Sequence, residues 1–302
     1  MRLLVLSQYF WPETFGINAL AKVLARNGHA ITVLTGQPNY PEGTVFHGYR
    51  AWKMMSERYD GVEVLRLPLA PRGKRSAMRL ALNYLSFVVS ALLLGPLMLR
   101  GRSFDAVFVY APSPLLQALP AVFISWYKKA PLVVWVQDLW PESLEATGFV
   151  RNKRLLRWVE FAVRFLYRHT DLILVPSRAF IEPVERLGAP LDKIIYFPNA
   201  YVPERLDSLP VCGDAMALAD RISQAFSIVF AGNLGVAQSL ETILDAAERL
   251  QESGVPARIL LVGSGSRSEW LQEQILRRKL ANVELPGRYP PEAMGFIYGE
   301  AS

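Results

Sequence analysis

The chain has 302 residues, enough for two α/β domains that each bury a core of their own. Hydrophobic residues make up 51% and charged residues 20%, which fits a globular protein with an unusually apolar surface or a long buried helix. A lone Cys212 excludes an internal disulfide and suits a reducing cytoplasm, and three scattered histidines argue against a zinc site. The formal net charge of +6 favours anionic partners, namely nucleotide phosphates, acidic lipid headgroups or nucleic acid.

Short β-rich runs alternate with longer helical runs in the first two thirds of the chain, a pattern typical of βαβ units around a parallel sheet. We expect strands at 2–7, 30–35, 62–67, 105–110, 131–136, 171–175 and 193–197, the first of them too short for a signal peptide. We expect helices at 18–27, 114–128, 152–170 and 177–188. This first α/β domain covers residues 1–200, and residues 201–225 are expected to be a linker with one helix.

A second, similar unit is expected over residues 226–302. Its predicted elements are a strand at 226–231, a helix at 238–253, a strand at 257–262, a helix at 267–280, a short strand at 282–285 and a helix beginning at 290. A doubly wound domain of the usual kind has about five or six strands. Since only three are found, we expect this second domain to be incomplete.

The segment 80–99 carries no charge over twenty residues and is long enough to span a bilayer. Polar side chains nevertheless follow one face of the predicted helix, at Arg79, Asn83, Ser86 and Ser90. A span would also place the strands on either side of it across a membrane from each other. Three alternatives stay open: a span, a helix in the membrane surface, or ordinary core packing. The neighbouring basic run suits anionic headgroups or is a solvated loop: Arg72, Lys74, Arg75 and Arg79.

The loop after the first predicted strand, residues 7–16, should border a ligand site, because ligands of open parallel sheets bind beyond the carboxyl ends of the strands. Gly16 permits close backbone approach, and a helix that begins at Ile17 or Asn18 presents free N–H groups to a phosphate. The loop is not a GxGxxG, which argues against a dinucleotide fingerprint. An ordinary glycine turn is the alternative.

A second candidate site follows the strand at 131–136, where carboxylates and tryptophans crowd together in the run VWVQDLWPES. Asp138 and Glu142 could orient a hydroxyl or accept its proton, and Trp140 offers an indole face that suits a sugar ring. The alternative is that Asp138 or Ser143 caps the next helix.

The order of these motifs resembles family 4 glycosyltransferases, especially the branch that builds bacterial O-antigens, capsules and colanic acid. The resemblance covers essentially the whole chain and is carried by the runs QYFWPETFGIN, QPNYPEG, DLWPESL, LILVPSRAF, FPNAY, FAGNLGVAQSLETILDAA and LLVGSGSRSEWL. It implies a GT-B fold, in which two Rossmann-like domains face each other across a cleft. The N-terminal domain would take the acceptor, and the C-terminal one a nucleotide sugar, usually a UDP-sugar. Transfer would proceed with retention, without a metal ion and without any cofactor beyond this substrate.

By the same resemblance, Gly16 and Ile17 would meet the donor diphosphate, while Glu13 and Asn18 would line the cleft. Asp138 would contact the transferring sugar or the acceptor, as base or orienting group, with Trp140 and Glu142 on the acceptor side.

In the second domain, Asn233 and Gln238 stand where many members carry an arginine and a lysine for the diphosphate. Both are uncharged, so we expect hydrogen bonding in place of charge neutralisation. Gly263 and Gly265 would lie near the ribose, with an ordinary glycine turn as the alternative. The last pair, Arg288 and Tyr289, would lie near the edge of the base.

The paired glutamates of the family would fall beyond residue 302, so the chain is expected to be truncated. The expected function is transfer of a sugar to a lipid-linked saccharide by a cytoplasmic protein that sits peripherally on the inner membrane face. Two alternatives stay open: an acceptor-binding half that needs a separate C-terminal partner, and a UDP-sugar 2-epimerase. Nucleic-acid binding is disfavoured, because the basic residues accompany no recognition module.

Overall fold

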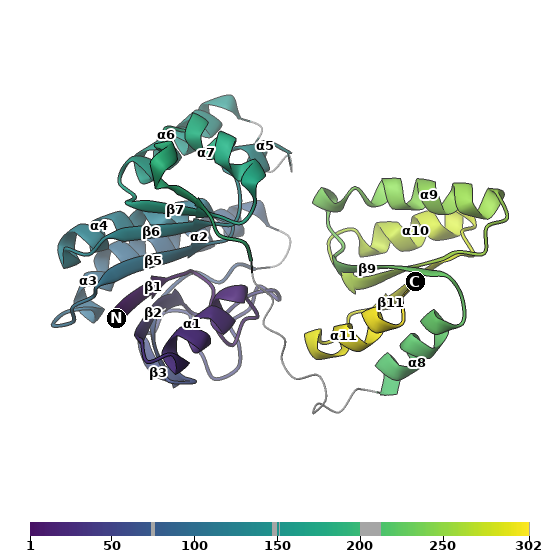
Figure 1. The fold of residues 1–302 in the computed structure, drawn as a ribbon, viewed down its shortest axis with the longest axis horizontal. Coiled ribbons are helices and arrows are strands. Elements are labelled where there is room, and N and C mark those ends of the chain that lie inside the picture. The colour runs from purple at the N-terminus through teal and green to yellow at the C-terminus, as the bar shows by residue number, and fades with distance from the viewer. Residues whose placement is uncertain (74–75, 147–149, 151, 200–212, 302) are drawn as a thin grey trace. The chain divides into compact units, whose positions relative to one another are not determined.

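The strands of the first two thirds of the chain form one eight-stranded sheet. The computed structural model describes residues 1–73, 76–146, 150, 152–199 and 213–301. They belong to two compact units, Met1–Tyr201 and Val202–Ser302 (Figure 1). The sheet of the first unit has the order β3-β4-β2-β1-β5-β6-β7-β8. Its parallel strands are β1 (Arg2–Leu6), β2 (Ala30–Gly36), β4 (Val62–Leu67), β5 (Ala106–Ala111), β6 (Leu132–Val136), β7 (Leu172–Val175) and β8 (Ile194–Tyr196).

The seven parallel strands agree with the predicted ones to within one residue or two at each end, but the edge strand β3 (Met55–Tyr59) was not predicted. It pairs antiparallel with β4 through the turn at Asp60 and Gly61, whose φ angles are 45° and 84°. Two positive φ angles in an Asp-Gly pair are typical of a tight hairpin turn. That dipeptide was the signal that could have revealed the strand.

Helices cover both sides of this sheet. They are α1 (Gly16–Arg26), α2 (Ala77–Leu93), α3 (Gly95–Met98), α4 (Leu119–Lys128), α5 (Glu142–Ala146), α6 (Lys153–Arg168) and α7 (Ile181–Arg186), with 3-10 turns η1 (Leu115–Ala118), η2 (Arg178–Phe180) and η3 (Leu191–Lys193). The uncharged segment 80–99 is therefore two helices, interrupted before Gly95. Among the described helices, none combines the length and the apolar character that a membrane crossing needs.

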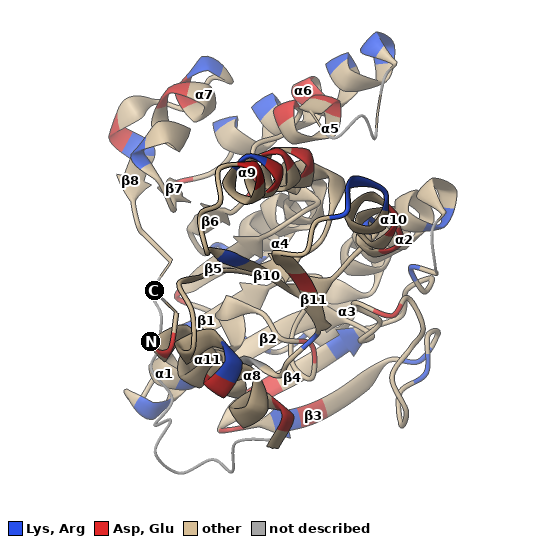
Figure 2. Ribbon diagram, turned by 90° about the vertical axis from the view of Figure 1, so that its right-hand side faces the viewer, with Lys and Arg blue, Asp and Glu red and all other residues tan. Residues whose placement is uncertain are grey.

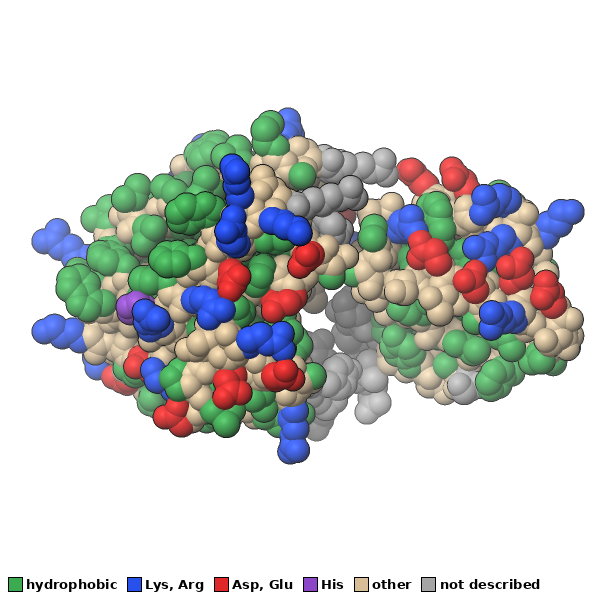
Figure 3. Space-filling model, turned by 90° about the horizontal axis from the view of Figure 1, so that it is seen from above, with side chains coloured by type: hydrophobic (Ala, Val, Ile, Leu, Met, Phe, Trp, Pro, Cys, Tyr) green, Lys and Arg blue, Asp and Glu red, His purple; other side chains and the backbone are tan. Residues whose placement is uncertain are grey.

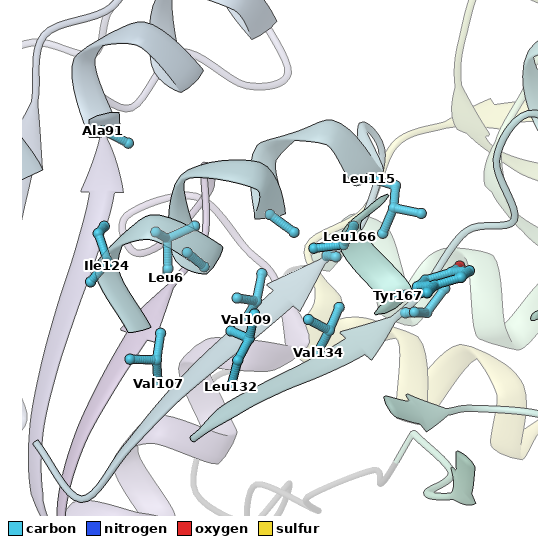
Figure 4. Packing of buried hydrophobic residues seen from close by; sticks show 14 of the residues in the cluster. Leu6, Ala91, Val107, Val109, Leu115, Ile124, Leu132, Val134, Leu166 and Tyr167 are labelled. Carbon is cyan, nitrogen blue, oxygen red and sulfur yellow. The ribbon is translucent and has the colours of Figure 1, made fainter. Parts of the chain in front are cut away.

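Two hydrophobic clusters form the core of the first unit, one on each face of the sheet. Alternate residues of a strand point to opposite faces, so Leu4 and Leu6 join one cluster while Val5 joins the other. The larger cluster packs the strands against α2, α4 and α6, and Figure 4 shows Ala91, Ile124 and Leu166 of these helices over the strand side chains. Fully buried Ile17 and Ala21 anchor α1 to the opposite face.

The second unit has a three-stranded parallel sheet of order β11-β10-β9. Its elements are α8 (Gly213–Ser223), β9 (Ser227–Asn233), η5 (Val236–Gln238), α9 (Leu240–Glu252), β10 (Arg258–Ser264), α10 (Ser268–Arg278), β11 (Val283–Gly287) and α11 (Pro291–Gly299). One cluster packs the sheet against α9 and α10, and the other packs it against α8 and α11. The helix expected within the linker is α8, and because Leu218 and Ile222 lie in that second cluster it forms part of the second unit.

Candidate functional site

The topology of the first unit places the candidate site at the carboxyl ends of β1 and β5. Strand β1 lies between β2 and β5, so the connections leave in opposite directions on its two sides. In parallel sheets this switch point is where ligands bind, beyond the carboxyl ends of the strands. The loops that follow β1, β5 and β6 carry residues 7–15, 112–114 and 137–141.

Glu13 lies in the first of these loops, but it is only 2% exposed and does not line an open surface. Its Oε1 accepts hydrogen bonds from the backbone N–H groups of Asn39 (2.8 Å) and Tyr40 (2.7 Å), and its Oε2 accepts one from Phe10 (3.3 Å). The expectation that Glu13 lines the cleft is therefore wrong, since its carboxylate ties the loop after β1 to the loop after β2. Burial raises its pKa to about 7, against the lowering effect of these N–H donors and of Arg66.

Asn18, the second residue expected in the cleft, holds the same loop. Its Oδ1 accepts from the Trp11 N–H at 3.1 Å, and its Nδ2 donates to the Glu13 carbonyl at 2.7 Å. Each polar group of the side chain thus bonds the backbone of the loop. Asn18 therefore positions the loop, because both polar atoms of its side-chain amide are bonded to the loop backbone.

The donors predicted for a phosphate lie at the start of α1, which begins at Gly16, one or two residues earlier than expected. The side chain of Phe15, which precedes the helix, makes no capping hydrogen bond. The Asn18 N–H donates to the Phe15 carbonyl (3.0 Å), so the N–H groups of Gly16 and Ile17 are the ones left to point beyond the helix. Gly16 is exposed, whereas the Ile17 side chain is fully buried. Ile17 can therefore contribute only its backbone N–H.

Asp138 follows β6 and is held from two sides by its own loop. The Trp140 Nε1–H donates to Oδ2 at 3.1 Å, and the Ser143 hydroxyl donates to Oδ1. Ser143 lies inside the short helix α5, so the two residues expected as alternative helix caps are bonded to each other. The carboxylate is half-buried, which leaves it a fixed direction and partial access to solvent.

Trp140 and Glu142 differ in exposure. Trp140 is only 4% exposed and packs in the larger hydrophobic cluster, so the expectation that its ring offers a face to a sugar is wrong. The indole is buried because its N–H finds the carboxylate of Asp138 and its rings fill the core below. Glu142 is exposed at the start of α5, where a carboxylate can reach a ligand.

A group of hydroxyls near Asp138 was missed by the sequence analysis. Burial raises the pKa of Tyr84 on α2, and the nearby Asp138 charge adds to the rise. Arg72, Tyr9 and Ser113 lower the same pKa, so all of these groups interact with one phenol. A tyrosine inside an apolar helix gives no sequence signal that its hydroxyl lies near Asp138. Only the fold brings α2 beside the loops after β1, β5 and β6.

Buried amides lock the same loops together. The Gln8 N–H donates to Gln117 Oε1 (2.6 Å), and Gln8 Nε2 donates to Asn83 Oδ1 (2.7 Å). Asn83 Nδ2 in turn donates to Asn39 Oδ1 (3.3 Å) and to the Ala70 carbonyl (2.7 Å). The network connects the loops after β1, β2 and β4 with α2 and η1, and it gives the site a fixed frame.

In the second unit, the expected donor residues lie at the carboxyl edge of the three-stranded sheet. Asn233 ends β9 opposite Ser264 of β10, and both Asn233 and Gln238 are exposed. Arg288 and Tyr289 follow β11, the neighbouring strand. Arg288 is exposed, whereas Tyr289 packs partly against the cluster under α8 and α11. Fold topology thus brings all these residues to one edge.

Gly263 and Gly265 are required by the packing of two loops. A Cβ at Gly263, where φ is +140°, would collide with the Gly232 carbonyl, and one at Gly265 would collide with the Leu234 backbone. The loops are joined by bonds from Leu234 N to the Ser264 carbonyl (3.0 Å) and from Arg267 N to the Leu234 carbonyl (2.9 Å). The close packing of these loops is thus sufficient to explain both glycines, as the glycine-turn alternative holds. The contact with a ribose stays a prediction.

Arg267, a cation that the sequence analysis passed over, lies at this edge. Its guanidinium stands 3.8 Å from the centroid of the Trp270 ring and forms an ion pair with Glu241 at the start of α9. Figure 2 marks several acidic residues along the ribbon of α9. The pairing neutralises Arg267 locally, so it is a weaker candidate for a phosphate contact than a free arginine.

The hollows found within each unit lie elsewhere. One of about 560 Å³ borders the end of α4 and is lined by Trp126, Lys129 and Asp171 among others. Another of about 400 Å³ lies between β9 and α9 and is almost entirely apolar. Neither borders the carboxyl ends of the parallel strands, where ligands of such sheets bind. Among the residues that the structure describes, no group of three His, Cys, Asp or Glu is placed to hold a metal ion.

The profile of the glycosyl transferase 4-like domain matches residues 16–200, more than half of the chain. The chain belongs to this family. A glycosyl transferase of Escherichia coli K12, WcaI, named for colanic acid biosynthesis, is 25% identical over 301 residues, which cover 94% of this chain and 71% of the relative.

Solved structures show the fold of this glycosyl transferase 4-like chain. Sucrose-phosphate synthase from Thermosynechococcus elongatus superposes with a TM-score of 0.70 at 13% identity, covering 99% of this chain and 73% of that one. An E. coli trehalose-6-phosphate protein bound with UDP-2-fluoro glucose gives 0.66 at 12% identity, covering 100% and 77%. Anabaena HepE with UDP-glucose gives 0.58 at 14% identity, covering 100% and 72%. The fold is GT-B, with Rossmann-like α/β units.

The match locates the candidate residues within the family. Gly16, Ile17, Asp138 and Glu142 lie inside the range 16–200, whereas Glu13 precedes it. The expected donor residues of the second unit lie after it. The family therefore shows that the chain is a glycosyltransferase.

Proposed function

We propose that this glycosyltransferase moves a sugar from a nucleotide-sugar donor, most simply a UDP-sugar, to a lipid-linked saccharide during surface-polysaccharide synthesis. The observation that carries the proposal is Asp138, a carboxylate fixed by Trp140 and Ser143 at the carboxyl edge of β6, in the unit that matches the family. The likeness to a relative named for colanic acid biosynthesis supports the polysaccharide context. The place of action would be the cytoplasmic face of the inner membrane.

In this proposal the second unit binds the donor. Asn233 and Gln238 are exposed beside the carboxyl end of β9 and would hydrogen-bond the diphosphate without neutralising it. The loop of Gly263 and Gly265 would lie against the ribose, and the exposed Arg288 with Tyr289 against the base. Two of the similar structures hold a UDP-sugar or an analogue of one, which supports uridine as the first nucleotide to test.

The first unit would hold the acceptor and help with the leaving group. The free N–H groups of Gly16 and Ile17 would meet the diphosphate, since a helix N-terminus favours negative charge. Asp138 would orient the acceptor hydroxyl or accept its proton, because its carboxylate is fixed by two donors and half-open to solvent. We expect retention at the anomeric carbon and no requirement for an added metal ion.

Calorimetry of the 302-residue chain with UDP and with GDP tests the donor side. Selective binding of UDP with a micromolar dissociation constant supports the proposal. Incubation with UDP-sugars, with and without lipid-linked acceptors from membranes, then separates transfer from epimerisation of the donor alone. If the folded chain binds neither nucleotide, the assigned donor residues are wrong.

A further inference from the structure

Helix α2 has its polar side turned inward and its apolar side turned outward. Asn83 is fully buried in the amide network, and the Ser86 hydroxyl accepts from the Ala70 N–H at 2.9 Å. The side chains that point away from the sheet are large, apolar and each more than a third exposed: Met78, Leu82, Leu85, Val89, Leu92 and Leu93. Their spacing of three and four residues makes one stripe along the helix. A helix bathed only in water has the opposite arrangement.

The two neighbouring helices continue this apolar surface with aromatic rings. On α4, the exposed rings are Phe123, Trp126 (74% exposed) and Tyr127, and on α6 the exposed residues are Leu155, Trp158 (71% exposed), Phe161 and Phe165. The α4 rings contact one another, with centroids 6.0 Å apart for Phe123 and Trp126. Apolar patches of this kind on a surface mark an interaction site.

These three stripes lie on one layer of the molecule. Helix α4 contacts both α2 and α6, and all three cover the same face of the eight-stranded sheet. Figure 4 shows their inner side chains, Ala91, Ile124 and Leu166, directed at the strands. The outward stripes therefore form one surface, here called the three-helix face. Figure 3 shows hydrophobic side chains gathered over a broad part of the first unit, with Lys and Arg side chains among them.

The charge of these helices has one sign. Their only acidic residue is Glu160, which pairs with Arg164, while seven basic residues lie on the same helices: Arg79, Lys128, Lys153, Arg154, Arg157, Arg164 and Arg168. The resulting net charge of +6 equals the formal net charge of the whole chain. Most of this charge lies on α6, whose five basic residues are all exposed beside its apolar side chains. Lys128 on α4 instead donates to the carbonyls of Leu99 and Arg102.

We propose that the three-helix face docks onto the surface of a lipid bilayer with anionic headgroups. Tryptophan and tyrosine favour the boundary between headgroups and acyl chains, because each ring has a large apolar body and a polar tip. Long basic side chains reach from such a surface to phosphate groups. A second copy of the chain fits less well, since the exposed basic residues of its own α6 would meet like charges.

The proposed surface differs from the basic loop expected from the sequence. Lys74 and Arg75 of that loop lie outside the described residues, and Arg72 stands with its guanidinium 5.1 Å from the centroid of the Tyr40 ring. The docking proposal rests on the proposed function in one respect: the lipid-linked acceptor would lie in the same membrane. Binding to vesicles is measured without any sugar, so the two proposals fail separately.

Flotation of the 302-residue chain with vesicles tests the docking. The wild-type chain should float with an equal mixture of phosphatidylcholine and phosphatidylglycerol and much less with phosphatidylcholine alone, and high salt should weaken it. The variant Leu85→Glu/Trp158→Glu should bind the mixed vesicles about a hundredfold more weakly, because it loses apolar burial and adds charges that anionic headgroups repel. The control Val255→Glu/Leu276→Glu makes the same change at exposed positions of the second unit and should bind as the wild type does.

Circular dichroism and melting show whether each variant folds. A second measurement needs no variant: brominated lipids in mixed vesicles should quench the tryptophan fluorescence of the wild-type chain. Equal flotation of both double variants, or an unquenched wild type, would overturn the proposal. The proposal is also overturned if the wild-type chain does not bind vesicles but forms a dimer, and if Leu85→Glu/Trp158→Glu is the only one of the two double variants that is monomeric.

Discussion

Two carboxylates of the first unit differ in how far their hydrogen-bond donors leave them accessible to a ligand. Glu13 is buried and bonded by three backbone N–H groups, whereas Asp138 is half-buried and bonded by two side chains. Three backbone donors fix two loops and leave little of the Glu13 carboxylate for a ligand. Side-chain donors leave part of Asp138 open, and Asp138 is therefore the better candidate for chemistry.

The variant Asp138→Asn tests the proposed role. Turnover should fall about a hundredfold, because an amide cannot accept the proton of an acceptor hydroxyl. Melting should stay close to that of the wild type, since an asparagine still accepts from Trp140. Ser143→Ala is the matched control, because it removes one donor and keeps the carboxylate, and it should retain most activity. Normal turnover in a well-folded Asp138→Asn protein would remove Asp138 from the mechanism.

Glu13 should make the stability of the protein depend on pH. Because the folded pKa of about 7 is above the ordinary 4.5, the folded state binds more protons than the unfolded state between these values. Stability is thus greatest at low pH as far as this group is concerned, and it is lost as pH rises through the folded pKa, by about 3 kcal/mol in total.

The variant Glu13→Gln carries no such titration. Urea unfolding at about pH 5 and about pH 8 should show the variant gaining stability relative to wild type as the pH rises. Glu182→Gln, a change at an exposed carboxyl on α7, controls for the loss of any one carboxylate. A wild-type–variant difference that is the same at both pH values would show that Glu13 keeps its ordinary pKa in the fold.

At the scale of elements, α2 shows that a helical pattern does not by itself reveal which side of the helix is buried. The polar stripe through Asn83 and Ser86 exists as predicted, but it faces the loops after β1, β2 and β4. Those loops present backbone and amide groups that need partners when buried. The stripe satisfies them, and the apolar side is left outside. Periodicity finds a two-sided helix and cannot tell which side meets the sheet.

The paired loops of the second unit provide a test at the same scale. Gly265→Ala places a Cβ against the backbone of Leu234, and we expect a loss of about 2 to 4 kcal/mol together with loss of UDP binding. Gly299→Ala is the control, because nothing lies within 4 Å of its Cβ and alanine suits the helix α11. Urea unfolding and calorimetry measure both variants. Unchanged stability in Gly265→Ala would mean that the loops separate easily.

At the scale of the whole molecule, each unit has its own hydrophobic clusters and its own sheet. A ligand stabilises the part that binds it, by about 2.7 kcal/mol at a hundredfold excess over the dissociation constant. We expect UDP to slow amide hydrogen exchange in the loops after β9, β10 and β11 and at the first turn of α1. Exchange in α4 and α6, which carry no predicted donor residue, is the internal control. Protection in those helices alone would place the nucleotide elsewhere.

The sequence by itself determined the succession of strands and helices, the parallel sheet and the family, because these depend on local periodicity and on motifs with fixed spacing. It also predicted that Asp138 follows β6 and that Asn233, Gly263 and Arg288 lie at or just beyond the carboxyl ends of the strands of the second unit, as the structure shows. Only the tertiary structure decided the burial of Glu13 and Trp140, the grouping of Tyr84 with Asp138, and the outward apolar side of α2. Each of these depends on partners far away in the chain, such as Asn39 for Glu13 or Gln8 for Asn83, and the burial of a side chain is settled by what packs against it.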